Sequence, residues 1–305
     1  MISGILLPRG NREPLMKKVV VATDSVSYIP AETAATYGIP VISAYVIIDG
    51  KSRPEVEVDL ADFYHQMPAW KEANRLPTTS SPSSDDFIRF FTDLSREAES
   101  IVYIGYSDKL GMGISSAIQA KAVLEKELPQ TEIEVINTKS ACGAQILTAI
   151  ETARLAAAGA GFAEVAAWAK EMVTKVNFVI ISDDLYYLAK GGRIHRARPW
   201  AASRITNSVI LRMDASTGGE HIPVARCRTK GEMLKALLDN VAQHSDNGKL
   251  HVAINHADVP AEAEELEEKA RARFDCQEVL ISNIGPLVTS HTGLGTRIFT
   301  WWGEN

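Results

Sequence analysis

The first half of the chain repeats a buried strand, a polar loop and a helix three times. The strand candidates are residues 19–22, 101–104 and 134–136, and each is followed by a polar segment and a helix-like segment. This repeat is typical of a parallel sheet with helices on both faces. Parallel strands bring their carboxyl ends to one edge, so the polar loops are expected to gather there, where open α/β proteins bind ligands.

Two other segments of the first half carry local signals. Residues 41–48 are an apolar run that ends at Asp49-Gly50, which predicts a second strand closed by a turn. Residues 76–84, LPTTSSPSS, are rich in Thr, Ser and Pro and are predicted to form a loop. The acids at 85–86 then favour the start of a helix.

Strands and helices alternate less strictly in the second half, which predicts a mixed sheet. Strands are expected at 176–181, 209–213, 222–228, 251–255, 278–281 and 297–301, and helices at 230–244 and 260–274. A length of 305 residues suits two domains. We predict a loosely held extension at 1–16, an N-terminal α/β domain at 17–176 with a mainly parallel sheet flanked by helices, and a C-terminal α/β domain at 177–305.

Composition argues against several classes of partner and location. The net charge of -6 makes nucleic acids and anionic membrane surfaces poor candidates. The three cysteines form no CxxC pair, so neither a zinc site nor a disulfide framework is indicated, and the reducing cytoplasm is the expected location. The apolar stretch at 2–7 is broken by Pro8 and is unlike a signal peptide, and no run of about 18 apolar residues predicts a membrane span.

Three polar segments of the first half are candidates for ligand contacts. Asp24, directly after the first strand, suits a ligand-binding or loop-orienting carboxylate, or an Asx turn or helix cap. The hydroxyls of residues 78–83 suit a carboxylate or phosphate, or simply cap the next helix. The three glycines of 105–113 allow backbone N–H groups to approach a ligand, or serve a tight connection; their spacing is not that of a nucleotide-binding loop.

Two segments of the second half add charge. Arg193, after a pair of glycines, suits an anion or a protein carboxylate, or is a surface cation beside a helix end. His291, among hydroxyls and glycines, is placed to neutralise a carboxylate. A hydrolase would need a nucleophile with a base and an orienting acid, and no GxSxG elbow supplies them. His251 and His256 are interpreted as structural, and neither a metal nor a cofactor is expected.

In this order, seven segments resemble the DegV family. They run through nearly all of the chain after residue 17: VATDSVSYIP (21–30), YGIPVISAYVIIDG (37–50), PTTSSPSSDDF (77–87), VINTKSACGAQ (135–145), ISDDLYYLAKGGRI (181–194), INHADVPAEAEEL (254–266) and IGPLVTSHTGLGT (284–296). The resemblance implies two α/β domains with a fatty acid in an apolar tunnel between them. It also implies a carrier without catalytic residues, which presents the carboxyl group to an ATP-dependent fatty acid kinase.

The resemblance assigns roles residue by residue. Thr79 matches the family threonine that hydrogen-bonds the carboxylate, and Ser80 follows it as in the family. His291 matches the histidine of the HTGxG loop near the head group. Arg193 matches the arginine of GGRI, and Arg228 resembles an arginine that engages the kinase; both are expected to face the partner.

One segment departs from the family pattern. The family loop after the third strand reads like SSxLSGTY, and the serine of its LSGT part is the second carboxylate ligand, but this chain has Gly111 at that position. Backbone N–H groups, Ser107 or Ser115 are candidates to compensate, while Asp108 would repel a carboxylate if it pointed inward. Two alternatives therefore stay open beside the carrier: a hydrolase that uses the polar loops, and a regulatory paralogue that has lost ordinary fatty-acid binding.

Overall fold

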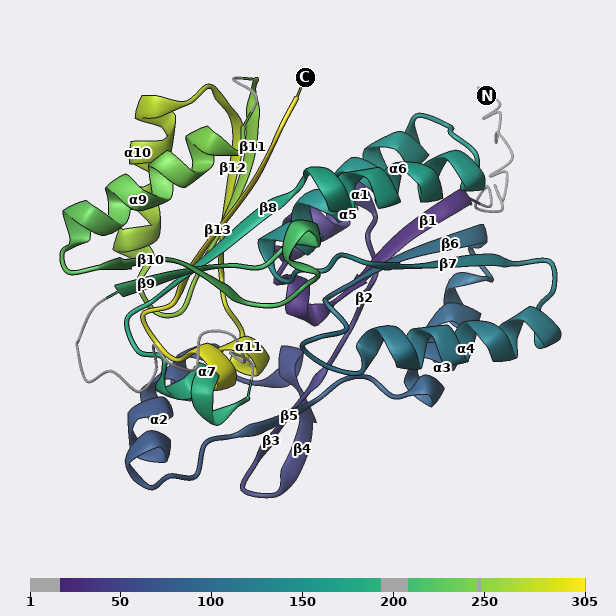
Figure 1. The fold of residues 1–305 in the computed structure, drawn as a ribbon. Helices are drawn as coiled ribbons and strands as arrows, with labels where there is room; N and C mark the ends of the chain where they lie inside the picture. The colour runs from purple at the N-terminus through teal and green to yellow at the C-terminus, as the bar shows by residue number, and fades with distance from the viewer. Residues whose placement is uncertain (1–16, 193–207, 246–247, 305) are drawn as a thin grey trace, which may run out of the picture.

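The structure is a computed structural model that describes residues 17–192, 208–245 and 248–304. The predicted extension at 1–16 and Arg193 lie outside these residues. The chain forms an α/β fold with three sheets, of which the two larger ones lie one on each side of a central helix (Figure 1). Within the described ranges, no helix is both long and apolar enough to cross a bilayer.

The first sheet has four strands, all parallel, as predicted. Its order is β2 (Val41–Ile42), β1 (Lys17–Asp24), β6 (Ala98–Gly105) and β7 (Glu132–Asn137). One face is covered by α3 (Ser84–Leu94) and α4 (Gly113–Glu127), and the other by α5 (Gly143–Ala157) and α6 (Phe162–Lys175) (Figure 1). The short α1 (Ala31–Tyr37) follows β1. The helices on both faces bury the apolar strands, as a parallel sheet requires.

The second sheet is mixed, as predicted, with β11 and β12 parallel and the other neighbours antiparallel. Its order is β10 (Ile222–Cys227), β9 (Ser208–Arg212), β8 (Asn177–Ser182), β13 (Arg297–Gly303), β11 (Leu250–His256) and β12 (Cys276–Asn283). One face packs on α9 (Lys230–Gln243) and α10 (Pro260–Arg273). All of its strands follow residue 176, and the domain border at that residue stays a prediction.

The third sheet was not predicted. It joins β4 (Lys51–Pro54), β3 (Tyr45–Ile48) and β5 (Thr78–Ser80) in antiparallel pairs. The single strand predicted at 41–48 is therefore wrong, because β2 and β3 belong to different sheets. The extended pairing is interrupted between them, where the Ala44 N–H donates to Ser25 Oγ at 2.9 Å. The prediction of a loop at 76–84 is wrong for the three residues of β5, which form a strand because they pair with β3.

Among the described residues, three further helices remain to be named. They are α2 (Leu60–Glu72), α7 (Tyr186–Lys190) and α11 (Pro286–Thr292). The last lies within the segment that leads to the final strand, and sequence reasoning did not identify it. Pro286 starts this helix and Gly293 ends it at a φ of 82°, which an L side chain rarely adopts.

Helix α5 fills the space between the two large sheets. Its residues Ala144 and Leu147 pack with Phe178 and Ile298 of the second sheet, whereas Ile150 packs against the first. Both ends of the helix are also bonded to the second sheet. The Gly143 N–H donates to Asn255 Oδ1 at 2.8 Å, and the Arg154 guanidinium donates to both Glu278 oxygens at 3.1 and 2.9 Å.

The start of α5 approaches the second sheet so closely that only glycine fits. A Cβ at Gly143 would lie 2.2 Å from Thr300 Oγ1 and 3.0 Å from the Ala253 Cβ. Thr300 has little freedom to move, because it is buried and donates to the Ala253 carbonyl at 2.8 Å. The spacing of helix and sheet is therefore set at this contact.

Gly143→Ala is expected to destabilise the protein by roughly 1–3 kcal/mol, because the methyl group overpacks the contact with Thr300. The measurement is the urea-induced unfolding midpoint. Gly231→Ala is the matched control, since Gly231 also lies in the first turn of a helix but has Thr229 Oγ1 no nearer than 4.0 Å. Equal midpoints for the two variants would contradict the claim that Gly143 sets the spacing.

Candidate ligand-binding site

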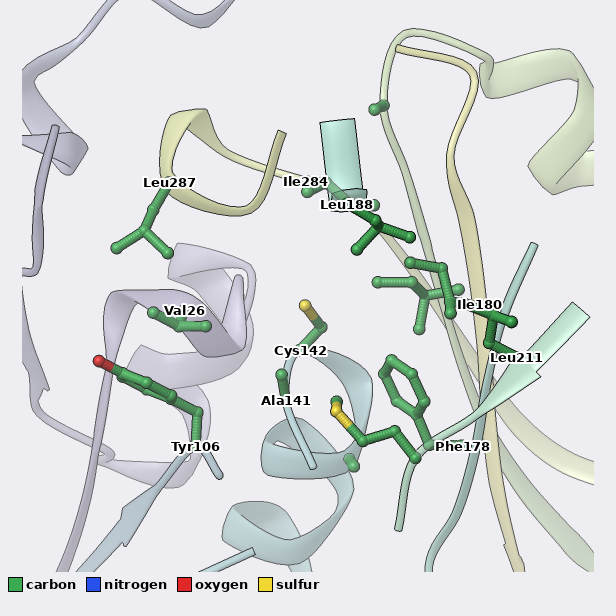
Figure 2. Close-up of a cluster of buried hydrophobic side chains, with 14 of the residues drawn as sticks. Val26, Tyr106, Ala141, Cys142, Phe178, Ile180, Leu188, Leu211, Ile284 and Leu287 are labelled. Atoms are coloured by element: carbon green, nitrogen blue, oxygen red, sulfur yellow. The ribbon is translucent and has the colours of Figure 1, made fainter. Parts of the chain in front are cut away.

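A cavity of ≈ 410 Å³ lies where the loops of the first sheet meet the inner face of the second. Its apolar wall includes Val26, Cys142, Phe178, Ile180, Leu188 and Ile298. Its polar wall includes Thr79, Ser80, Ser81, Tyr106, His221 and His291. Figure 2 shows Val26 and Tyr106 on one side, Phe178 and Ile180 on the other, and Cys142 between them. The cavity thus has the form of an amphiphile site, apolar with a few convergent polar groups.

Thr79 and His291 form the first polar pair of the cavity. Thr79 Oγ1 and His291 Nε2 are 2.8 Å apart although the residues are 212 positions apart in the chain. Thr79 is the central residue of β5 and is less exposed than its neighbours Thr78 and Ser80. His291 lies in the last turn of α11. A hydroxyl and an imidazole at this spacing can together hold a carboxylate.

Ser81 and Tyr106 form the second polar pair. Their hydroxyl oxygens are 2.6 Å apart, and the Met112 N–H donates to Ser81 Oγ at 3.0 Å. A Cβ at Gly111 would lie 2.8 Å from the Tyr106 hydroxyl and 3.1 Å from Ser81 Oγ. These two hydroxyls therefore occupy the space that a serine side chain at position 111 would need.

Tyr106 keeps its proton at neutral pH. Burial, and after it the charge of Asp24, raises the pKa of Tyr106 to about 12, against the lowering effects of the hydrogen bonds with Ser81 and the Gly113 N–H. The side chain is only 4% exposed, so the ring cannot swing away without opening the core. Sequence reasoning missed Tyr106, because nothing local distinguishes it from an ordinary core tyrosine after a strand.

Asp24 lies outside the cavity lining and is fully buried below the loop that follows β1. Its carboxylate accepts from Tyr103 Oη at 2.6 Å, Gln145 Nε2 at 3.2 Å and the Val26 N–H at 3.0 Å. Burial is the main cause that raises the pKa of Asp24 to about 6. The structure therefore places Asp24 as a helix cap and a loop-orienting group, and Val26 on that loop reaches the cavity.

Ser107 and Ser115 use their hydroxyls within the protein. Ser107 Oγ donates to the Gly219 carbonyl at 3.2 Å, and Ser115 Oγ donates to the Met112 carbonyl at 2.8 Å. Neither residue lines the cavity. Asp108 binds Lys139 at 3.0 Å and Asn137 at 2.8 Å, both near the surface, so its charge is already paired.

Helix α11, which carries His291, is held at its start by a buried acid. Glu55 accepts from the Leu287 N–H at 3.0 Å, from Tyr28 Oη at 3.2 Å and from Ser25 Oγ. Tyr28 Oη in turn accepts from the Val288 N–H at 3.0 Å. Burial is the main cause that raises the pKa of Glu55 to about 7.

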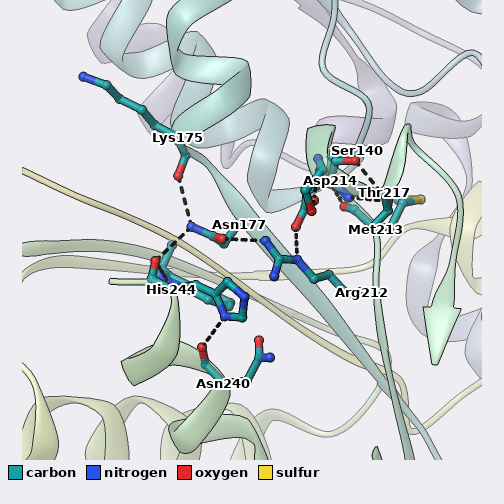
Figure 3. Close-up of polar contacts among 11 residues, drawn as sticks. Ser140, Lys175, Asn177, Arg212, Met213, Asp214, Thr217, Asn240 and His244 are labelled. Atoms are coloured by element: carbon teal, nitrogen blue, oxygen red, sulfur yellow. Dashed lines mark hydrogen bonds and ion pairs between the residues drawn. The ribbon is translucent and has the colours of Figure 1, made fainter. Parts of the chain in front are cut away.

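Met213 lines the cavity and is fixed by contacts from both halves of the chain. Its carbonyl accepts from Ser140 Oγ at 2.9 Å, and its N–H donates to the Phe178 carbonyl at 3.3 Å. Next to it, Arg212 donates to Asp214 and to Asn177 Oδ1, the latter at 3.1 Å (Figure 3). This network holds the end of β9 against the loop after β7.

Two basic residues of the sequence interpretation lie apart from the cavity. Arg228 is exposed and lines a separate surface groove with Asp183, Lys230, Glu262 and Arg297. Arg193 falls outside the described residues. Sequence reasoning also missed His221, a buried residue of the cavity wall just after Gly218 and Gly219.

The fold and site define an α/β protein that encloses a half-polar, half-apolar cavity between two sheets. A sequence model of the family described as "Uncharacterised protein, DegV family" matches residues 18–301, and the chain belongs to that family. A DegV domain-containing protein of Halalkalibacterium halodurans is 28% identical over 294 residues, which cover 95% of this chain and 100% of that one.

Two solved structures are similar over almost the whole chain. DegV of Bacillus subtilis, described as a fatty acid binding protein, superimposes with a TM-score of 0.80 at 25% identity and covers 94% of this chain and 100% of its own. A Thermotoga maritima protein whose structure is described as revealing a fatty acid binding function has a TM-score of 0.80 at 27% identity, with coverage of 94% and 100%.

The pKa of Glu55 predicts a pH dependence of stability. It rises from its ordinary 4.5 to about 7 on folding, so its contribution to stability is fully present below pH 4.5 and is lost as the pH rises through 7. The Gln side chain of the Glu55→Gln variant cannot titrate, so the variant does not lose this contribution. As the pH rises from 4.5 to 7, its free energy of unfolding should therefore increase relative to that of the wild type by about 3 kcal/mol. Urea unfolding at both pH values measures this.

Glu57→Gln is the control for that comparison, since Glu57 lies in the same short helix but is exposed. It should follow the wild-type pH dependence. If Glu55→Gln also ran parallel to the wild type, Glu55 would not be the buried proton-holding group described above.

Proposed function

We propose that this protein binds a long-chain fatty acid in the cavity, with the carboxylate at Thr79 and His291 and the tail along the apolar wall. The observation that carries this is one cavity whose lining combines hydroxyl and imidazole groups, among them the hydrogen-bonded Thr79 and His291, with aliphatic and aromatic side chains. The fatty acid binding ascribed to the relatives from Bacillus subtilis and Thermotoga maritima supports it.

The apolar wall supplies most of the expected affinity. Each CH₂ group removed from water contributes about 0.8 kcal/mol, less the cost of association. The polar pair contributes orientation, since a carboxylate that found no hydrogen bond in this buried end would lose the free energy of its hydration. We therefore expect the affinity to depend less on the structure of the tail than on the chemistry of the head group.

Thr79→Val is expected to weaken fatty acid binding about tenfold, because the carboxylate loses one hydroxyl donor. The measurement is a titration of delipidated protein with oleic acid, after native mass spectrometry has identified any lipid carried from expression. Thr78→Val is the matched control: Thr78 is the preceding residue of β5, is exposed and does not line the cavity. A protein that carries no lipid and binds no fatty acid would overturn the proposal.

We further propose that the protein presents the bound carboxyl group to an ATP-dependent fatty acid kinase and makes no bond itself. Arg228 is suited to the partner-facing side because it is exposed and lines a surface groove together with the exposed Lys230. The cytoplasm, where such a kinase finds ATP, is the proposed location. This protein would only hold the fatty acid, and the partner kinase would catalyse the phosphoryl transfer.

Arg228→Ala is expected to lower the yield of acyl phosphate about tenfold without changing oleic acid affinity, because one charge-assisted contact with the kinase is lost. Acyl phosphate is trapped with hydroxylamine in a mixture of the carrier, a purified bacterial fatty acid kinase, oleic acid and ATP. Arg96→Ala, at an exposed arginine that borders neither the cavity nor the groove, is the control. An unchanged yield would argue against Arg228 as a partner contact, and ester hydrolysis by the carrier alone would argue against a pure carrier.

A further inference from the structure

The Ser81–Tyr106 pair has a hydrogen-bonding capacity that the fold itself does not use up. Both residues line the cavity, and their hydroxyl oxygens are 2.6 Å apart. Each oxygen already faces a backbone donor: Met112 N–H lies 3.0 Å from Ser81 Oγ, and the Gly113 N–H interacts with the Tyr106 oxygen. The pair is thus supplied with donors from the protein side.

Counting protons shows what the pair lacks. Two hydroxyl groups carry two protons, and one of these is used in the hydrogen bond between them. Within the described parts of the chain, neither hydroxyl has a further acceptor. Whichever residue donates within the pair, one O–H therefore remains to be satisfied, and the groups that surround it are N–H donors. The remaining O–H group therefore needs a hydrogen-bond acceptor, which a ligand in the cavity would supply.

The position of the pair relates this need to the head group. Ser81 is two residues from Thr79, and both side chains line the same cavity. The pair is also held in place, because Tyr106 is buried and Gly111 leaves the space that its hydroxyl fills. A carboxylate is an acceptor only and takes several hydrogen bonds, whereas an alcohol or ester accepts more weakly.

We propose that Ser81 and Tyr106 form a second head-group contact, which donates one hydrogen bond to the ligand and makes the site selective for a carboxylate over a neutral head group. This deepens the proposed function and rests on it. The two hydroxyls are redundant, since either one alone still carries a free proton when its partner is removed. Together with Thr79 and His291, they would give the carboxylate donors from two separate segments of the wall.

The test compares oleic acid with oleyl alcohol, which has the same tail and a neutral head. Titrations of delipidated protein are made with the wild type, Tyr106→Phe, Ser81→Ala and the double variant. Each single variant should lose less than about threefold in affinity for the acid, and the double variant about tenfold or more, because only the double variant lacks a free O–H. Affinity for the alcohol should change less than about threefold throughout.

The alcohol reports on whether the cavity keeps its shape, and a thermal melt reports on folding. Tyr64→Phe is the control for loss of a buried tyrosine hydroxyl, since Tyr64 Oη donates to the Ile284 carbonyl at 2.6 Å and does not line the cavity. A double variant that binds the acid as the wild type does would overturn the inference. So would equal losses for acid and alcohol, which would assign the pair to cavity shape.

Failure of the proposed function gives a different result. In that case the wild type itself would bind neither oleic acid nor oleyl alcohol, and the inference would fall with it. If the wild type binds oleic acid and the double variant keeps the full preference for acid over alcohol, the inference is wrong and the proposed function stands.

Discussion

The close contact between the start of α5 and the second sheet sets how far apart the two large sheets lie on either side of the cavity. Gly143 brings the helix backbone to Thr300 and Asn255, and Arg154 ties the other end of the helix to Glu278. The loops at the carboxyl edge of the first sheet are thereby held opposite β8 and β13, which contribute Phe178, Ile180 and Ile298 to the cavity wall. A wider spacing would separate these two walls and open the cavity to water.

The polar end of the cavity depends on a second set of long-range contacts. Thr79 is placed by the pairing of β5 with β3, whereas His291 is placed by α11, whose first N–H groups are bonded to Glu55 and Tyr28. Ser81 and Tyr106 add a hydroxyl pair to the lining of the same cavity. Groups from three separate parts of the chain thus converge on one wall, as orientation of a single charged group in an apolar cavity requires.

Much of the fold could be predicted from the sequence, because strand and helix periods are local signals. The parallel first sheet, the mixed second sheet and most helices follow from apolar runs and their punctuation. The small third sheet could not be predicted, since three residues of β5 have no periodicity of their own and depend on pairing with Val46 and its neighbours. The site was predicted only in part for a similar reason. Ser107 was chosen as a nearby hydroxyl, but the fold turns it to Gly219 and turns its neighbour Tyr106 into the cavity.

Our central proposal is that the cavity between the two sheets holds a fatty acid by its carboxylate. The most direct measurement is a crystal structure of the protein as purified from a bacterial host. We expect continuous elongated density along Phe178 and Ile180, with two oxygens within hydrogen-bond distance of Thr79 and of the Ser81–Tyr106 pair. A cavity that contains only separate water molecules, or a tail whose head group points away from Thr79, would contradict it.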